Sequence, residues 1–194
     1  MNFADFETLA RKNRSFRRFE QDKMIETDTL KRLINLARLS PSAANLQPLR
    51  YIPVNDASKK NALFPALSWA GYIQGWDGPG EGEKPAAYLI MLGDTTISDY
   101  LEYDAGIAAQ SILLGARSQK LAGCILGALN REQISKTFSI PSEMQIMMVI
   151  ALGYPAEKVV LDEDTTDPVT YYRDKNDTHH VPKRPLDELI VNYT

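Results

Sequence analysis

Apolar side chains recur every three or four residues along several stretches of the chain, the spacing at which a helix buries one face. The longest such stretch predicts a helix from about Asp99 to Lys120. A second helix, capped by Thr27 or Asp28, should end at Ser40-Pro41, because the residue before a proline avoids helical backbone. Shorter helices are expected from Phe3 to the break at Asn13, from Ser58 through Leu67, and from the cap Asn130 to Ile140-Pro141.

Four apolar runs are predicted as strands. Ala86–Leu92 carries no charged residue, which favours a central strand that is buried on both faces. Pro53 has no N–H to donate, so the strand Leu49–Val54 should lie at an edge or end there. Gly127 interrupts the run Leu121–Leu129, and a glycine in a strand marks a bulge or the close approach of a ligand. The fourth run is Gln145–Leu152.

The predicted helix Asp99–Lys120 is rich in small residues, including Gly106 and Gly115. Glycine in a helix costs roughly 1 kcal/mol relative to alanine, so the two glycines need a packing reason. Close packing against a second copy of the helix in a dimer would supply one. A tightly packed monomeric core would explain the pattern nearly as well.

The helix-to-strand loop Ser40–Pro48 combines serine, asparagine and glutamine with two stiffening prolines. Its hydroxyl and amide groups donate and accept hydrogen bonds without net charge, which suits a planar, uncharged ligand such as an isoalloxazine or nicotinamide ring. The alternative is a capped turn whose polar side chains satisfy their own backbone.

Arginines and phenylalanines alternate in the segment Arg14–Phe19, around a serine. Such a cluster can bind a phosphate through charge-assisted hydrogen bonds. It can equally be a solvated basic turn that pairs with Glu7, Glu20 and Asp22. The glycine-rich, aromatic stretch from Trp69 to Pro85 lacks the features of a phosphate-binding loop. It is expected to be a mobile flap over a pocket or a partner-binding loop, with an ordinary surface excursion as the alternative.

After Pro155 the chain becomes charged and turn-rich. The apolar and aromatic residues within it indicate that it packs on another part of the protein rather than forming a solvated tail. Lys183 and Arg184 form a basic pair between prolines. His179 and His180 are adjacent and have no third ligand nearby, so we expect them at the surface rather than at a metal.

Composition limits the classes of function. The chain has 194 residues, a net charge of -3 and one cysteine. These values predict a single domain, 1–194, with an extended C-terminal segment from about residue 156, no binding to nucleic acid, and a reducing, cytoplasmic location. No apolar run is long enough to span a membrane. No nucleophile constellation stands out, and the recurring cationic groups suit an anionic cofactor that carries its own chemistry.

Five motifs give the chain a resemblance to the nitroreductase family of FMN-dependent oxidoreductases. They occur in the order found in that family over nearly the whole chain. The motifs are Arg14–Phe19, Ala37–Pro48, Asp104–Gln110, Gly123–Ala128 and Val181–Arg184. The resemblance implies an α+β fold: a three-layer sandwich with a mainly antiparallel central sheet between helices, in an intimate homodimer that holds FMN at the subunit interface.

The resemblance also implies the cofactor-binding residues. Arg14, Ser15 and Arg17 should approach the FMN of their own subunit, and Lys183 and Arg184 its phosphate. The residues expected to meet the partner subunit's flavin are Pro41, Ser42, Ala43 and Asn45. Leu126, Gly127 and Ala128 should run beside the ring, with a backbone N–H aimed at the flavin N5. Arg17 is expected near N1 and O2, where reduced flavin carries negative charge, and Gln47 should support its loop.

The implied reaction takes hydride from NADH or NADPH onto flavin N5 and reduces a nitroaromatic, quinone or similar acceptor by a ping-pong mechanism. No side chain is expected to be catalytic and no metal is expected. The alternatives are a protein that binds or handles flavin without turnover, and a dimeric interaction protein with a vestigial site. Asn13, Leu49 and Ile125 depart from residues common in the family, which leaves the acceptor open.

Overall fold

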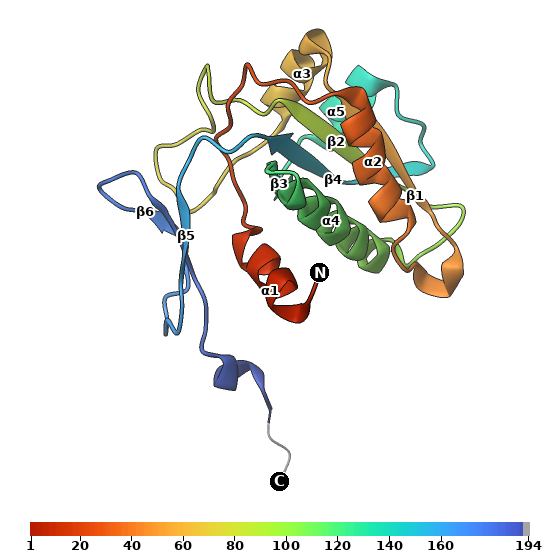
Figure 1. The fold of residues 1–194 in the computed structure, drawn as a ribbon. Helices are drawn as coiled ribbons and strands as arrows, with labels where there is room; N and C mark the ends of the chain where they lie inside the picture. The colour runs from red at the N-terminus through yellow and green to blue at the C-terminus, as the bar shows by residue number, and fades with distance from the viewer. Residues whose placement is uncertain (192–194) are drawn as a thin grey trace.

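A four-stranded antiparallel sheet forms the middle layer of the protein. The computed structural model describes residues 1–191. The strands lie in the order β1-β2-β4-β3 (Figure 1). Their bounds are β1 Leu49–Val54, β2 Ala87–Asp94, β3 Ala122–Leu126 and β4 Met144–Gly153. Because β1 pairs only with β2, the edge position predicted from Pro53 is confirmed.

Helices cover both faces of this sheet. The helices are α1 Phe3–Lys12, α2 Thr27–Arg38, α3 Ala57–Leu63, α4 Leu101–Ser118 and α5 Arg131–Phe138, and short 3₁₀ turns span Ala43–Asn45, Phe64–Ala66 and Leu186–Leu189. α2 and α4 pack on one face, and α3 and α5 lie toward the other (Figure 1). The predicted α+β, three-layer arrangement with a mainly antiparallel sheet is confirmed.

Strand β2 shows why the layers form. Leu89 and Met91 point into the core beneath α2 and α4, while Tyr88 and Ile90 point into the opposite core. Every residue of β2 is buried, as the uncharged run predicted. The side chains alternate between faces because successive residues of a strand point in opposite directions.

Strand β3 is shorter than the sequence predicted. It ends at Leu126, and the chain then leaves β4. The Ser68 N–H donates to the Ala128 carbonyl at 3.0 Å, and the Asn130 N–H donates to the Ala66 carbonyl at 2.8 Å. These bonds draw the segment after Leu126 toward the 3₁₀ turn Phe64–Ala66, so the extension of the strand to Leu129 was wrong.

The two glycines of α4 have different surroundings. A Cβ at Gly115 would overlap the end of the Leu36 side chain of α2, so a larger residue there would displace that side chain. A Cβ at Gly106 would meet nothing within 4 Å in the described chain. Packing within one chain therefore explains only one of the two.

The C-terminal segment forms a second, smaller sheet beside the main body (Figure 1). Its strands are β5 Val159–Asp162, β6 Tyr172–Arg173 and β7 His179–Pro182, in the order β5-β7-β6. β5 runs parallel to β7, and Val159 packs against the core. The segment therefore packs, as its apolar residues indicated; residues 192–194 of the predicted domain lie outside the described part. None of the helices described is both long and apolar enough to cross a membrane.

Candidate cofactor-binding site

The segment Arg14–Phe19 runs along the outer edge of β3. Ser15 pairs with Gly123 in parallel, and the Phe16 N–H donates to the Gly123 carbonyl at 3.1 Å. Phe16 and Phe19 are buried in the core, which fixes the intervening side chains in place. The hydrophobic alternation of the motif is therefore what positions its arginines.

The arginines of this segment fall into two kinds. Arg18 forms ion pairs with Asp177 and, at 3.2 Å, with Glu83, so it is a structural residue. This matches the idea of a paired basic turn, although the acidic partners are not those the sequence named. In the described chain neither Arg14 nor Arg17 forms an ion pair with a carboxylate.

Arg14 is a partly buried cation with one protein partner. It donates to the Ala10 carbonyl at 2.6 Å, and its Nε is buried with no hydrogen-bond partner among the described residues. Burial, and secondly the positive charge of Arg11, lower the pKa of Arg14. A guanidinium in this setting is stabilised by an anion, which the described residues do not supply.

Arg17 lies in a cavity of about 220 Å³ at the end of β3. The cavity brings Arg17 together with three other predicted site residues, Leu126, Gly127 and Ala128. Its remaining walls are Ser68–Gly71, Cys124, Ile125 and Tyr171. The guanidinium is buried, and its Nε has no partner among the described residues.

Gly127 faces this cavity without any crowding from the protein. A Cβ at Gly127 would meet nothing within 4 Å, and its backbone is not left-handed. Nothing in the described chain therefore demands glycine here. A ligand that lies close to the backbone would give a reason for it.

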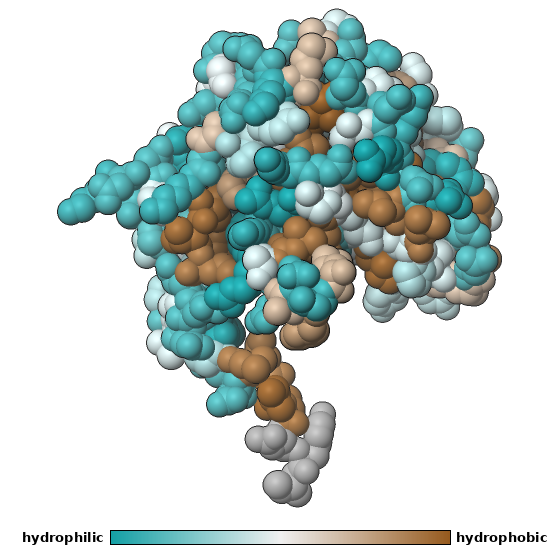
Figure 2. All heavy atoms as spheres, in the orientation of Figure 1, coloured by the Kyte–Doolittle hydropathy of each residue, from teal (hydrophilic) through white to brown (hydrophobic). Residues whose placement is uncertain are grey.

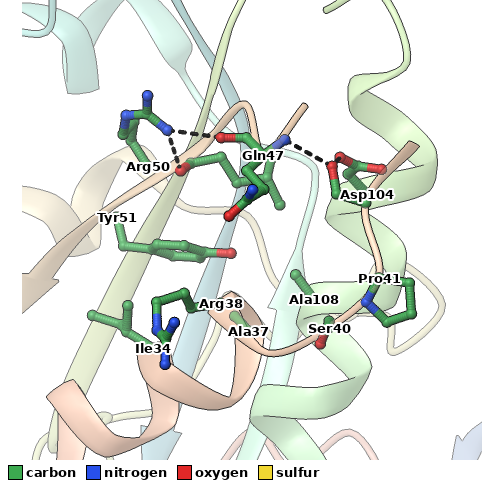
Figure 3. Close-up of a pocket in the computed structure, with 12 residues that line it drawn as sticks. Ile34, Ala37, Arg38, Ser40, Pro41, Gln47, Arg50, Tyr51, Asp104 and Ala108 are labelled. Atoms are coloured by element: carbon green, nitrogen blue, oxygen red, sulfur yellow. Dashed lines mark hydrogen bonds between the residues drawn. The ribbon is translucent and has the colours of Figure 1, made fainter. Parts of the chain in front are cut away.

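The loop Ser40–Pro48 is anchored by Asp104 of α4, whose carboxylate is buried. Asp104 accepts hydrogen bonds from the Ser42 hydroxyl and, at 2.9 Å, from the Ala43 N–H. The Gln47 N–H in turn donates to Ser42 Oγ at 2.9 Å (Figure 3). The side-chain amide of Gln47 donates to the Asn45 carbonyl at 3.2 Å, so Gln47 supports the loop as expected.

Three non-glycine residues of this loop adopt left-handed backbone. Their φ angles are 49° at Ala44, 56° at Asn45 and 52° at Gln47. Each such residue costs of order 1–3 kcal/mol and persists only where its surroundings fix it. Asp104 supplies that constraint, and strained loops of this kind cluster at ligand sites.

A second cavity, of about 270 Å³, opens between this loop, β1 and the helices α2 and α4 (Figure 3). Pro41 and Ser42 line it together with Tyr51 and Asp104, while Ala43 and Asn45 lie in the adjoining 3₁₀ turn. Burial, and secondly the charge of Asp104, raise the pKa of Tyr51 to about 12, so its phenol stays protonated at neutral pH.

Lys183 and Arg184 line a third cavity, in the C-terminal segment. Arg184 forms ion pairs with Asp167 at 2.8 Å and Glu188 at 3.3 Å. Eight of the twelve predicted site residues thus line three different cavities of one chain, and Arg14, Ser15, Ala43 and Asn45 line none of the three. A site that uses all of them would have to be completed by something outside this chain.

The two adjacent histidines have different environments, because strand β7 points them in opposite directions. His179 is 1% exposed, so the expectation of a surface position was wrong for it. His180 lies 2.9 Å from Asp162 and stacks on Tyr172 with ring centres 4.7 Å apart. Among residues 1–191 no group of three histidine, cysteine or acidic side chains could hold a metal ion.

Sequence reasoning did not assign a role to Tyr171, His179 or Asp104. Arg17 Nη1 lies 3.2 Å from His179 Nε2, and its guanidinium carbon lies 4.8 Å from the centre of the Tyr171 ring. The adjacent pairs Tyr171-Tyr172 and His179-His180 are the sequence signal that could have identified Tyr171 and His179. Because successive residues of a strand point to opposite faces, one member of each pair points toward the protein interior.

The Trp69–Pro85 stretch is tied to the N-terminal segment. The Phe19 N–H donates to the Glu83 carbonyl at 2.9 Å, and the side chain of Gln21 accepts from the Gly82 N–H at 2.9 Å. Trp69 is buried, and residues Ser68–Gly71 form a wall of the Arg17 cavity. The start of the stretch therefore borders a pocket, and its role as a mobile flap stays a prediction.

Comparison with known proteins identifies the family to which the chain is similar. The model of the nitroreductase family matches residues 10–154. A protein from Archaeoglobus fulgidus, provisionally named NADH dehydrogenase/NAD(P)H nitroreductase, is 26% identical over 168 residues, which cover 81% of this chain and 91% of that protein. An iodotyrosine deiodinase from Thermotoga neapolitana is 24% identical over 200 residues and 95% of each chain.

Solved structures agree with the sequence comparison. An FMN-dependent nitroreductase from Clostridium difficile R20291 superposes with a TM-score of 0.67 at 21% identity, over 96% of this chain and 97% of that one. This likeness shows the fold. Because the family model matches most of its length, the chain belongs to the nitroreductase family.

Proposed function

We propose that this protein is an FMN-dependent oxidoreductase that takes electrons from NADH or NADPH and passes them to a nitroaromatic, quinone or similar acceptor. When bound, FMN supplies the hydride-accepting N5 atom, and donor and acceptor react with it in turn by a ping-pong mechanism. The names of the relatives from Archaeoglobus fulgidus and Clostridium difficile support this proposal.

The observation that carries the proposal is the pair Arg14 and Arg17. Neither guanidinium forms an ion pair with a described residue, whereas Arg18 and Arg173 both do; a buried Nε without a hydrogen-bond partner among the described residues is common to all four. FMN carries a phosphate and a ring that gains negative charge on reduction. The donors of this site therefore match the cofactor in charge and in hydrogen-bonding type.

Each part of the site has a proposed task. Arg17 would stabilise the negative charge that reduced flavin carries at N1 and O2, and Arg14 and Ser15 would help to hold the same cofactor. The backbone beyond Leu126 would hold the ring, and Gly127, which has no Cβ, would permit close contact there. Arg184 already pairs with Asp167 and Glu188, so a contact with the phosphate requires it to leave at least one of them.

A homodimer is part of the proposal. The loop Ser40–Pro48 and the cavity around Arg17 would then belong to one site shared between two chains. Exposed apolar side chains on α1, α4 and the C-terminal segment support a large contact; Figure 2 shows apolar residues near the end of the C-terminal segment, projecting from the main body. They include Phe3, Phe6, Tyr103, Ile107, Leu186 and Leu189.

Steady-state turnover tests the reaction. FMN-loaded protein would be given NADH or NADPH with 4-nitrobenzoate or menadione as acceptor, over a matrix of both concentrations. The proposal predicts acceptor-dependent consumption of the nicotinamide and parallel double-reciprocal lines. Reduction of bound FMN without turnover of either acceptor would contradict it and favour a flavin-handling role.

A further inference from the structure

The buried guanidinium of Arg17 is held by two residues of the C-terminal segment. His179 opens strand β7, and its Nε2 lies 3.2 Å from Arg17 Nη1. Tyr171 precedes β6, and its ring centre lies 4.8 Å from the guanidinium carbon. The only other partner of the Arg17 side chain in the described part is the Ser15 carbonyl, at a long 3.4 Å.

The hydrogen bond between Arg17 and His179 can run in one direction only. A guanidinium has donors and no acceptor, so His179 Nε2 must accept and the ring proton must sit on Nδ1. Burial, and secondly the charges of Arg17 and Arg173, lower the pKa of His179 to about 4. His179 is therefore neutral near pH 7, and it orients Arg17 without cancelling its charge.

Tyr171 supports the same guanidinium from its aromatic face, a contact that also leaves the positive charge uncompensated. The Tyr171 ring lies 5.3 Å from that of His179 and 5.1 Å from that of Tyr72. Its hydroxyl accepts a hydrogen bond from the Tyr72 N–H at 3.4 Å. Tyr171 also lines the Arg17 cavity, so it joins the C-terminal segment and the loop after Trp69 at the site.

We propose that Tyr171 and His179 are positioning residues that aim Arg17 at the bound cofactor, and that they thereby strengthen binding of reduced FMN relative to oxidised FMN. The inference rests on the proposed function. A neutral acceptor and an aromatic face hold the arginine in place, whereas a carboxylate in their position would neutralise the charge that reduced FMN requires.

Two matched substitutions of His179 test this. His179→Gln keeps an acceptor oxygen on a side chain of similar reach, and His179→Leu removes it. The measurements are the dissociation constant of oxidised FMN by fluorescence titration and the midpoint potential of bound FMN by equilibration with a reference dye. His179→Leu should weaken the binding of reduced FMN about tenfold relative to the binding of oxidised FMN. This change lowers the midpoint potential by about 30 mV for a two-electron couple.

His179→Gln should retain most of the wild-type potential. Equal shifts in both variants, or no shift in His179→Leu, would overturn the inference while leaving the proposed function intact. If wild-type protein binds no FMN, the proposed function fails first and the inference fails with it.

A double-mutant cycle separates positioning from general loss of structure. In an Arg17→Ala background His179→Leu should no longer change the potential, because the residue through which it acts is absent. An undiminished shift there would overturn the inference. Tyr171→Leu against Tyr171→Phe repeats the test independently should His179→Leu fail to fold: the leucine variant should lower the potential, and the phenylalanine variant should preserve it.

Discussion

Two pairs of arginines differ in what surrounds them: Arg18 with Arg173, and Arg14 with Arg17. Arg173 bonds to Glu157 at 2.7 Å, with the two side chains only 9% and 2% exposed, and Arg18 pairs with Asp177 and Glu83. Trp76 lies against both guanidiniums. Arg17 is buried and Arg14 is half-buried on the same segment as Arg18, yet no described carboxylate pairs with either.

The difference separates a structural cluster from a binding site. A buried charge is costly unless an opposite charge or several hydrogen bonds offset the loss of water. Arg18 and Arg173 meet that requirement within the chain. Arg14 and Arg17 have no carboxylate partner among residues 1–191, so a ligand with negative charge would add the compensation that these residues leave out.

The largest effect is expected where the structural cluster is broken. Glu157 accepts from the backbone N–H groups of Arg17 and Arg18 and from the side chain of Arg173. Glu157→Ala should lower the free energy of unfolding by about 3–5 kcal/mol, because it removes the buried partner of Arg173, which keeps only the exposed Asp177 at 3.3 Å, and leaves two backbone N–H groups without their acceptor. Urea denaturation measures this loss.

The exposed pair Glu132–Lys136 is the matched control for Glu157. Glu132→Ala should cost at most about 0.5 kcal/mol, since both side chains are in water. A loss in Glu157→Ala no larger than in this control would remove the distinction between the two kinds of arginine.

The next effect is a pH dependence of stability that originates at His179. Its pKa in the folded protein, about 4, lies below the ordinary value of 6.5. The unfolded chain therefore takes up a proton that the folded chain does not, and stability should fall as pH decreases from about 6.5 to 4, by up to about 3 kcal/mol. His179→Gln should flatten this part of the profile. Parallel profiles for the variant and the wild type, measured by urea denaturation, would contradict the assignment.

A smaller, complementary effect is expected at the binding site itself. Arg17→Ala should weaken FMN binding by about 1.5–3 kcal/mol, the range for a hydrogen bond to a charged group, and leave the unfolding free energy little changed. Arg18→Ala should do the reverse, with lower stability and near-normal FMN affinity. Calorimetric titration with FMN, together with denaturation, checks both. The account would be wrong if the two variants behaved alike.

The smallest expected effect concerns the loop after α2. Ser42 accepts from the Gln47 N–H and donates to Asp104. Ser42→Ala should cost about 1 kcal/mol of stability, because it leaves a loop N–H without its partner. Ser142, which is exposed and lies 3.4 Å from Glu143, is a control that should show no measurable loss. Equal stability of the two variants would mean that the Asp104 anchor is weak.

The sequence predicted the elements that hydrophobic spacing determines. The buried β2, the edge strand with Pro53, and the helices α2 and α4 follow from local pattern, because burial acts on one face of each element. The end of β3 did not follow, since the pairing of Ser68 with Ala128 depends on residues distant in the chain.

The site was predicted less completely than the fold. The motif Arg14–Phe19 identified the cationic segment but gave no means of telling Arg18 from Arg17, because their partners come from residues after 150 and from the Trp69–Pro85 stretch. The burial of His179 depends on the pairing of β5, β6 and β7. The sequence does not predict this pairing, because the strands are short and lie in a charged segment.

The most direct test of the binding-site account is the visible absorption spectrum of the protein loaded with FMN, recorded without oxygen before and after addition of NADH or NADPH. The account predicts a bound flavin spectrum that bleaches on addition of the nicotinamide. A protein that takes up no FMN, with Arg14 and Arg17 intact, would contradict the claim that these two arginines bind an anionic cofactor.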